Sequence, residues 1–298
     1  MKRNVTEVLS DIAAQPLDIF TQRFMLSDDQ FQSICQLIYQ KAGIVLTNNK
    51  REMVYNRLTR RLRELRMNNF GDYLAFLKSD VRNPEWQEFV NALTTNLTAF
   101  FREAHHFPIL AKHARKRAGA GGVYRVWCAA ASTGEEPYSI AMTLRDVFGN
   151  NPYKTKIIAS DIDTNVLDKA RKGVYRQEEL KTLNDEYLKK YFLKGVGDFE
   201  GYVKIRQQIS EMVSFQYLNL LDKQWDLEGS FDAIFCRNVM IYFDKTTQQT
   251  LLNRFTSLLK PDGMLFVGHS ENVSQLSKDF YLHGHTVYGL TPARRGYE

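Results

Sequence analysis

The 298-residue sequence has few cysteines and no long apolar run, and these absences exclude several classes of protein. Cys35, Cys128 and Cys236 are scattered along the chain, so they predict reduced core thiols, not a disulfide framework or a zinc site. No stretch approaches the roughly 18–20 apolar residues that span a bilayer. The first residues include acidic side chains where a signal peptide would have its apolar core. We expect a cytoplasmic protein that does not insert into membranes, and we expect a monomer.

Two spacing patterns divide the chain. Apolar residues three and four apart predict helices in the first third, and strand-like alternation begins only near residue 120. Strands then alternate with helices, which is typical of an α/β domain with a mainly parallel sheet. We therefore expect a small all-α domain at 1–95, an interdomain segment and linker at 96–122, and an α/β domain at 123–298. The glycine-containing stretch at about 190–215 breaks the alternation and predicts a β-hairpin insertion.

Polar residues follow the predicted strands at the edge where such sheets bind ligands, namely the carboxyl ends of their strands. The sequence there reads "AAASTGEE" after the first strand, "SDID" after the second, "YLNLLD" after the third and "RNVMIYFD" after the fourth. The loop after the first strand has a single glycine. A dinucleotide loop would read G-x-G-x-x-G and a P-loop would end in G-K-[ST], so neither kind of phosphate site is predicted.

A ribose site is nevertheless indicated at this edge. Asp161 ends the second predicted strand, a position from which an acidic residue accepts hydrogen bonds from ribose hydroxyls. A ribose without a pyrophosphate fits S-adenosylmethionine, whose ammonium and sulfonium groups would face a carboxylate such as Glu136. The alternative is that Glu135 and Glu136 only offset the dipole of the helix that they begin.

Positive charge is concentrated in residues 50–66, which hold seven basic and two acidic residues and so have a local net charge of +5. Apolar residues in this segment predict a helix with one buried stripe and arginines around the rest of its surface. Such a helix indicates an acidic partner. The alternative is an ordinary solvated helix face.

Five motifs carry a resemblance to a known family: "ALTTNLTAFFRE", "ASTGEEPYS", "ASDID", "FDAIFCRNVMIYFD" and "LLKPDGMLFVGHSE". On these, the chain from about residue 25 resembles the CheR family of bacterial chemotaxis receptor methyltransferases. The resemblance implies a Rossmann-like, S-adenosylmethionine-dependent methyltransferase domain that follows a small all-α domain. It also implies the reaction, which esterifies glutamate side chains of chemoreceptors.

The resemblance further implies a set of cofactor-binding residues: Asn96, Thr98, Arg102, Glu136, Asp161, Asn219, Leu220, Arg237 and Asn238. Within this set Glu136 would meet the amino group of the cofactor, with Glu135 as the second choice. Asp161 would bind the ribose, and the Asn219–Leu220 pair would border the adenine. Arg102 and Tyr242 are the expected catalytic residues, because each can hold one oxygen of the acceptor carboxylate. No general base is needed, since a glutamate of pKa about 4.3 is already ionised.

Two receptor-binding regions are expected, the basic helix and the insertion. The helix would contact acidic receptor helices through Arg57, Arg60, Arg61 and Arg63. In the insertion, "YVKIRQ" is predicted to be a free edge strand that captures a receptor C-terminal tail by strand addition. The residues expected there are Gly195, Gly197, Gly201 and Lys204.

Two other functions compete with this one. A nucleic-acid methyltransferase would use the basic helix on phosphates, but no N-P-P-[YF] sequence follows the fourth strand and no aromatics interleave with the arginines. A non-catalytic S-adenosylmethionine-binding adaptor is the other reading. No metal site is predicted, because His105 and His106 have no partner at metal-ligand spacing; packing roles are expected for both. A ligand contact by His269 is left open.

Overall fold

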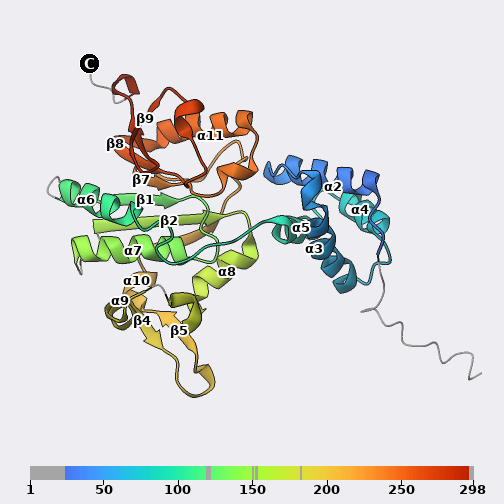
Figure 1. Ribbon diagram of the computed structural model, residues 1–298, viewed down its shortest axis with the longest axis horizontal. Coiled ribbons are helices and arrows are strands. Elements are labelled where there is room, and N and C mark those ends of the chain that lie inside the picture. The colour runs from blue at the N-terminus through green and yellow to red at the C-terminus, as the bar shows by residue number, and fades with distance from the viewer. Residues whose placement is uncertain (1–23, 119–121, 150, 152–153, 182, 295–298) are drawn as a thin grey trace, which may run out of the picture. The chain divides into compact units, whose positions relative to one another are not determined.

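The computed structural model describes residues 24–118, 122–149, 151, 154–181 and 183–294 (Figure 1). The start of the expected helical domain, residues 1–23, and most of the glycine run at 119–122 lie outside these residues. The described chain divides into two compact units. The first contains residues 24–36 and 47–93, and the second contains residues 37–46 and 94–294. Among the described helices, none combines the length and apolarity that crossing a membrane requires.

The first unit is helical, as expected. It comprises the first turns of α2 (Asp28–Ala42), the short η1 (Asn48–Lys50), α3 (Arg51–Glu64), α4 (Phe70–Ser79) and α5 (Glu85–Leu93). Val54, Leu58 and Leu62 of α3 recur every four residues and are fully buried, so the stripe predicted for this helix is confirmed. Asn69 begins α4 by accepting a hydrogen bond from the backbone N–H of Asp72.

The second unit contains a seven-stranded sheet. Its spatial order is β6 (Val213–Tyr217), β2 (Thr155–Asp161), β1 (Tyr124–Cys128), β7 (Phe231–Phe235), β8 (Leu259–Phe266), β10 (Val287–Leu290) and β9 (Phe280–Gly284). The first five strands run parallel, and β10 pairs antiparallel with both β8 and β9. The chain steps outward from β1 to β2 and β6, then returns to β7 on the other side of β1. The expected α/β class is confirmed, and the β1–β7 boundary is the topological switch point.

Helices cover both faces of this sheet (Figure 1). The helices packed on one face are α6 (His106–Ala118), α7 (Glu135–Phe148) and α8 (Thr164–Lys172), and α11 (Lys245–Leu258) packs on the other. Neighbouring residues of β1 serve opposite cores, Cys128 with α7 and Trp127 with α11. Residues 96–122 were expected to be an interdomain segment and linker. Phe100, Leu110 and Ala114 are buried in the α7-side core, however, so residues 96–118 are part of the second unit.

A second, three-stranded antiparallel sheet forms the insertion, with the order β3 (Val174–Arg176), β5 (Tyr202–Ile205) and β4 (Phe192–Lys194). The β4–β5 pair is the expected hairpin. However, the prediction of a free edge at β5 is wrong, because Lys204 pairs with Val174 on one side and Leu193 on the other. The expected boundaries also shift, since 213–217 form β6 of the main sheet. The short helices here and at the sheet's ends are η3 (Gln177–Leu180), α9 (Asp185–Tyr191), η4 (Gly197–Phe199), α10 (Gln207–Ser210), η5 (Met240–Tyr242), η6 (Val273–Gln275) and η7 (Pro292–Arg294).

Candidate active site

The loops after β1 and β2 meet at Asp161, the last residue of β2. One carboxylate oxygen of Asp161 accepts the backbone N–H of Ser132 at 2.8 Å, and the other accepts that of Asp163 at 3.0 Å. Burial raises the pKa of Asp161 to about 6, against the opposing effect of these N–H donors. Through these two hydrogen bonds the carboxylate holds the loop after β1 in place. Each carboxylate oxygen has a further lone pair that can accept a hydrogen bond from a hydroxyl group.

The single glycine of that loop has a specific reason. Gly134 has φ +101°, and a Cβ there would lie 2.7 Å from the hydroxyl oxygen of Tyr175 and 2.9 Å from the Cβ of Ala170. That Tyr175 hydroxyl donates to the carbonyl of Thr133 at 2.8 Å. The glycine is therefore needed for close packing of α8 and β3 against the loop, and not for the approach of a phosphate.

Asp163 is a residue that the sequence reasoning missed. Its Oδ2 accepts from the Thr94 hydroxyl at 2.6 Å and from the Asn96 amide at 2.7 Å, while its Oδ1 accepts the N–H groups that begin α8. The side chain of Ser132 adds a bond to the Asn96 carbonyl at 2.9 Å. The predicted site residue Asn96 is thus fixed beside the β1 and β2 loops. Asp163 could have been recognised from the sequence, because it is a carboxylate residue two positions after Asp161 at the start of a predicted helix.

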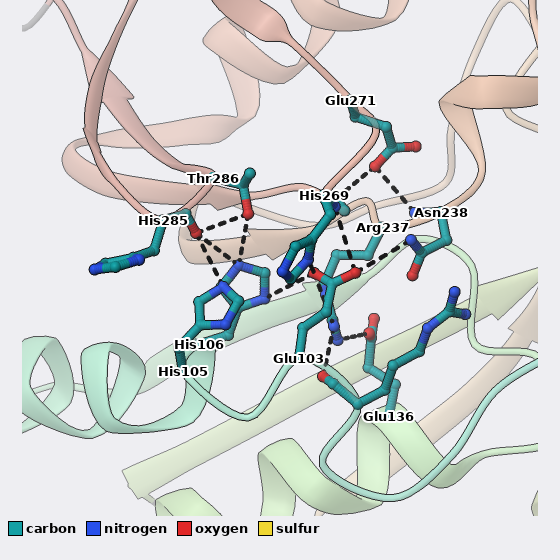
Figure 2. A network of polar contacts seen from close by, with 12 residues as sticks. Glu103, His105, His106, Glu136, Arg237, Asn238, His269, Glu271, His285 and Thr286 are labelled. Atoms are coloured by element: carbon teal, nitrogen blue, oxygen red, sulfur yellow. Dashed lines mark hydrogen bonds and ion pairs between the residues drawn. The ribbon is translucent and has the colours of Figure 1, made fainter.

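Arg237, which follows β7, joins the other half of the site (Figure 2). Its guanidinium pairs with Glu136 Oε2, lies 3.3 Å from Glu103 Oε2, and donates to the Arg102 carbonyl at 2.5 Å. Only 4% of Arg237 is exposed, so these contacts replace its hydration. The fold thus brings the backbone carbonyl of Arg102 and the side chain of Glu136, two predicted residues, into contact with the buried cation of a third, Arg237.

Charge pairing governs the ionisation of this group. Burial by itself would lower the pKa of Arg237, but Glu136 and Glu103 outweigh that effect and raise it. Burial by itself would raise the pKa of Glu103, but Arg237, His269 and Asn238 outweigh it and hold that pKa at about 2. The arginine is therefore cationic and Glu103 is anionic at neutral pH.

The two neighbouring glutamates at the start of α7 have different surroundings. Glu135 accepts the Thr133 hydroxyl at 2.6 Å, and burial raises its pKa. Glu136 faces Arg237, and its Oε1 accepts only the weak S–H donor of Cys128 at 3.2 Å among the bonds that the structure gives it. Glu136 is therefore the glutamate that points toward the residues after β7.

Glu271, a second residue missed from sequence, shapes the turn after β7. Its buried carboxylate accepts the backbone N–H groups of Asn238 at 3.0 Å, Val239 at 3.0 Å and Met240 at 2.8 Å. Asn238 has φ +57°, and its side-chain amide donates to Glu103 Oε1 at 3.3 Å. Glu271 lies 31 to 33 residues after the groups it binds, so no short motif reveals the contact.

Strained backbone gathers at this site. Phe101, Glu103, Ser132 and Asn238 all have φ between 49° and 57°, the left-handed region that non-glycine residues seldom occupy. Each such residue costs on the order of 1–3 kcal/mol and persists where its surroundings hold it, which is most common at functional sites. The strained residues therefore lie in the same loops as the buried charged groups of the site.

The remaining predicted residues of this unit lie on neighbouring loops. The Asn219 amide donates to the Lys41 carbonyl at 2.8 Å, so this side chain braces the loop after β6, and Leu220 is buried beside it. Arg102 is half-buried and donates to the Leu97 carbonyl at 2.7 Å. The set is completed by two half-buried residues, Thr98 and, in η5, Tyr242.

The arginines of α3 are not equivalent. Arg61 forms a two-point ion pair with the buried Glu85, at 2.9 Å and 2.6 Å, and Tyr73 donates to the same carboxylate at 3.0 Å. Its role is thus within the helical unit. Arg57 donates to the Ala92 carbonyl at 3.3 Å, and Arg60 is exposed.

Arg63 is half-buried, with its guanidinium carbon 5.9 Å from the ring centre of Phe24. Of the four expected arginines, Arg60 is therefore the one with an exposed side chain.

The glycines of the insertion build its turn. A Cβ on Gly195 would lie 2.0 Å from the Phe199 carbonyl oxygen, and Gly197 and Gly201 have φ +59° and +83°. The turn displays apolar side chains, with Val196 79% and Phe199 70% exposed. Lys204 is exposed on the central strand. The turn therefore exposes two large apolar side chains, a feature that the glycines alone did not suggest.

Comparison with known proteins identifies the family. Residues 96–288 match the S-adenosylmethionine-binding domain of CheR methyltransferases, and residues 29–94 match the all-alpha domain of the same proteins. The fold and these matches define an S-adenosylmethionine-dependent methyltransferase. The chain belongs to the CheR family of chemotaxis protein methyltransferases, which sets aside the nucleic-acid methyltransferase and adaptor readings.

Relatives match almost end to end. A chemotaxis protein methyltransferase of Salmonella typhimurium is 63% identical over 91% of this chain and 93% of its own length. A protein of the same description from Escherichia coli is 62% identical over 91% of this chain and 94% of its own length. Another, from Klebsiella aerogenes, is 60% identical over 97% of this chain and 99% of its own length. The predicted family, enzyme class and cofactor are confirmed.

Proposed function

We propose that this enzyme esterifies glutamate side chains on the cytoplasmic domains of chemoreceptors, with the site at the carboxyl ends of β1, β2 and β7 holding S-adenosylmethionine. The observation that carries the proposal is the pairing of a buried Glu136–Arg237 contact with Asp161 across the switch point of the sheet. A carboxylate on each side suits a cofactor with a hydroxylated sugar at one end and an ammonium at the other.

In this proposal Glu136 receives the ammonium of the cofactor. Its Oε1 is bonded only by the Cys128 thiol, a weak donor that a charged N–H readily outcompetes. Asp161 receives the ribose hydroxyls, and the Leu220 side chain borders the adenine. Glu135, engaged by Thr133, is not assigned to the cofactor. The cofactor supplies the electrophilic methyl group, and the residues fix its direction.

The acceptor needs orientation and not deprotonation. A glutamate carboxylate is ionised at neutral pH, so the enzyme has to place one of its oxygens about 3–3.5 Å from the methyl carbon, in line with the sulfur, and exclude water. Arg102 and Tyr242 are the proposed donors that hold the other oxygen. Arg237 is paired with Glu136 and Glu103. We therefore assign it to the cofactor side of the site and not to the acceptor carboxylate, whose reactivity a direct ion pair would lower.

Receptor recognition is proposed on two surfaces. On α3, the exposed Arg60 would lead contact with acidic receptor helices, and Arg57 would assist. On the insertion, a tail peptide would bind beside β4, an outer strand of the small sheet, whose neighbouring turn exposes Val196 and Phe199.

An open groove of about 530 Å³ lies next to β4. Its lining combines one apolar side chain, two cationic groups, two amides and one carboxylate, from Leu193, Lys190, Arg206, Gln207, Gln208 and Glu211. The carboxylate of Glu211 accepts a hydrogen bond from the Gln207 amide at 2.6 Å. This chemistry suits a peptide with an apolar side chain and an acidic or C-terminal carboxylate. Tethering there would raise the enzyme's local concentration near the methylation sites, to the mM range for a flexible link.

Transfer of a labelled methyl group to receptor cytoplasmic fragments tests the proposal. An ester at glutamate is released as methanol by alkali, and glutamate-to-glutamine changes in the receptor remove the label. Alkali-stable label on the receptor contradicts the proposal. Replacing Phe199 with Ser should weaken tail-dependent methylation. The control replaces Val81, an exposed apolar residue of the helical unit, with Ser and should leave it unchanged.

A further inference from the structure

A cluster of histidines lies beside Arg237, outside the cofactor contacts proposed above (Figure 2). Metal-ligating atoms of Glu103, His105 and His269 all lie within 4.8 Å of one another. From sequence, His105 has no partner at metal-ligand spacing. The fold supplies one, because His269 follows β8 and comes from 164 residues farther along the chain.

We propose that Glu103, His105 and His269 bind a divalent transition-metal cation, for which Zn²⁺ is the best match. Two imidazoles and one carboxylate are a common protein ligand set for zinc, with the fourth position open to water. Bonds of about 2.0–2.2 Å in a tetrahedral arrangement place two ligand atoms roughly 3.3 Å apart. Glu103 Oε2 and His269 Nδ1 are already 3.0 Å apart.

The hydrogen bonds of the rings favour this assignment. His105 Nε2 lies 3.2 Å from the His285 carbonyl oxygen, which can only accept, so Nε2 carries the hydrogen and Nδ1 carries the lone pair. A ring N–H directed at a backbone carbonyl is the usual second contact of a metal-binding histidine. The carbonyl is presented by a two-residue turn, His285 and Thr286, with φ +51° and +60°. Figure 2 shows the His285 ring itself pointing away from Glu103.

A second, independent observation comes from His106. This residue is completely buried, and its Nε2 donates to the same carbonyl at 3.1 Å. Its Nδ1 therefore carries a lone pair, has no hydrogen-bond partner, and faces Glu103 Oε2 at 3.8 Å. Two electron-rich atoms thus face each other in a buried place. Arg237, 3.3 Å from Glu103 Oε2, already supplies one positive charge there, and a metal ion on the His105 side would stabilise the pair further.

Solvent reaches the cluster through His269, whose side chain is 63% exposed and can adjust to a bound ion. Occupancy would also affect the cofactor site, and this consequence rests on the proposed function. Glu103 Oε2 is shared with Arg237 at 3.3 Å, so a metal would take this oxygen from the arginine. It would also add positive charge near a cofactor that carries an ammonium and a sulfonium. Zn²⁺ should therefore weaken S-adenosylmethionine binding.

Calorimetric titration of the tag-free chain with ZnCl₂ in a non-chelating buffer tests the site. One equivalent should bind to the wild type. The double variant H105A/H269A should bind more than about 100-fold more weakly, since even outer partners of metal ligands are worth 10- to 100-fold. The control H283A removes a histidine outside the ligand group and should bind as the wild type does. Co²⁺ should give the visible bands of a tetrahedral ion in the wild type and in H283A only.

The outcomes separate this proposal from the cofactor assignment, because S-adenosylmethionine binding is also measured without zinc for each variant. Equal zinc affinity in wild type and H105A/H269A overturns the metal site, and so does octahedral Co²⁺ with no change between them. Bound zinc should weaken cofactor affinity about five-fold or more, the lower range of typical coupling between sites. Stoichiometric zinc with unchanged cofactor affinity overturns the coupling.

Discussion

Replacing Arg237 with Met removes a buried cation and leaves its two carboxylate partners in place. Arg237 is 4% exposed, and the side chains of Glu103 and Glu136 are each 10% exposed, so water cannot replace the lost contacts. Breaking a buried ion pair from one side typically costs about 3–5 kcal/mol, because a charge remains uncompensated. We expect R237M to lower the free energy of unfolding by that amount and to weaken S-adenosylmethionine binding.

Urea unfolding in a W86F background isolates the effect, since Trp127 and Trp225 then report only on the α/β unit. If charge is the cause, E103Q/E136Q/R237M should recover most of the loss, because replacing all partners of a buried pair is often neutral. A cost below about 1 kcal/mol, or a triple variant no more stable than R237M, refutes the reasoning.

The pH dependence of R237M provides a further check with a defined sign. Glu103 has a folded pKa of about 2 against an ordinary 4.5, so its stabilising contribution is present above pH 4.5 and is lost as the pH falls toward 2. R237M raises that folded pKa toward the ordinary value. Its stability should therefore fall less steeply than that of the wild type between pH 4.5 and 2.

Two further predictions concern the loop after β1. The pKa of Asp161 is about 6, so its carboxylate is ionised above this pH and protonated below it; cofactor affinity should fall about tenfold from pH 7.5 to 5, and D161N should be weaker and lose this dependence. An unchanged pH slope in D161N contradicts the ribose assignment. G134A combines positive φ with a 2.7 Å clash against Tyr175 and should cost about 2–4 kcal/mol, whereas G201A, with φ +83° and no atom within 4 Å, should cost about 1–2 by thermal unfolding. Equal losses in the two variants contradict the packing role.

Features with a local cause could be predicted from the sequence. The buried stripe of α3 follows from apolar residues four apart, and Asp161 could be placed because parallel strands end at one edge of a sheet. The strands β9 and β10 were missed, since they are short and their turn, His285–Thr286, lacks the Asn-Gly or Asp-Gly signal typical of a two-residue hairpin. The prediction of a free edge at β5 was wrong because β3 pairs with the other side of this strand. With only three residues, β3 is too short to show a strand pattern in the sequence.

Polar contacts between residues far apart in the sequence could not be predicted, for a different reason. Spacing predicts which residues share a helix or a strand, but not which loops meet. Glu271 binds the backbone of a turn that lies more than 30 residues before it in the chain. Arg61 forms an ion pair with the buried Glu85, although its spacing had placed it among the surface arginines. The cluster of Glu103, His105 and His269 exists only because the end of β8 comes to lie beside the segment that precedes α6.

A crystal structure of the enzyme with bound S-adenosylhomocysteine tests the central claim, that the loops after β1, β2 and β7 form the cofactor site, most directly. The account predicts the amino group within hydrogen-bond distance of Glu136 and the ribose hydroxyls on Asp161. Arg237 should remain paired with Glu136 from the opposite side. A ligand bound elsewhere, or one in the reverse orientation with its amino group on Asp161, would contradict the account.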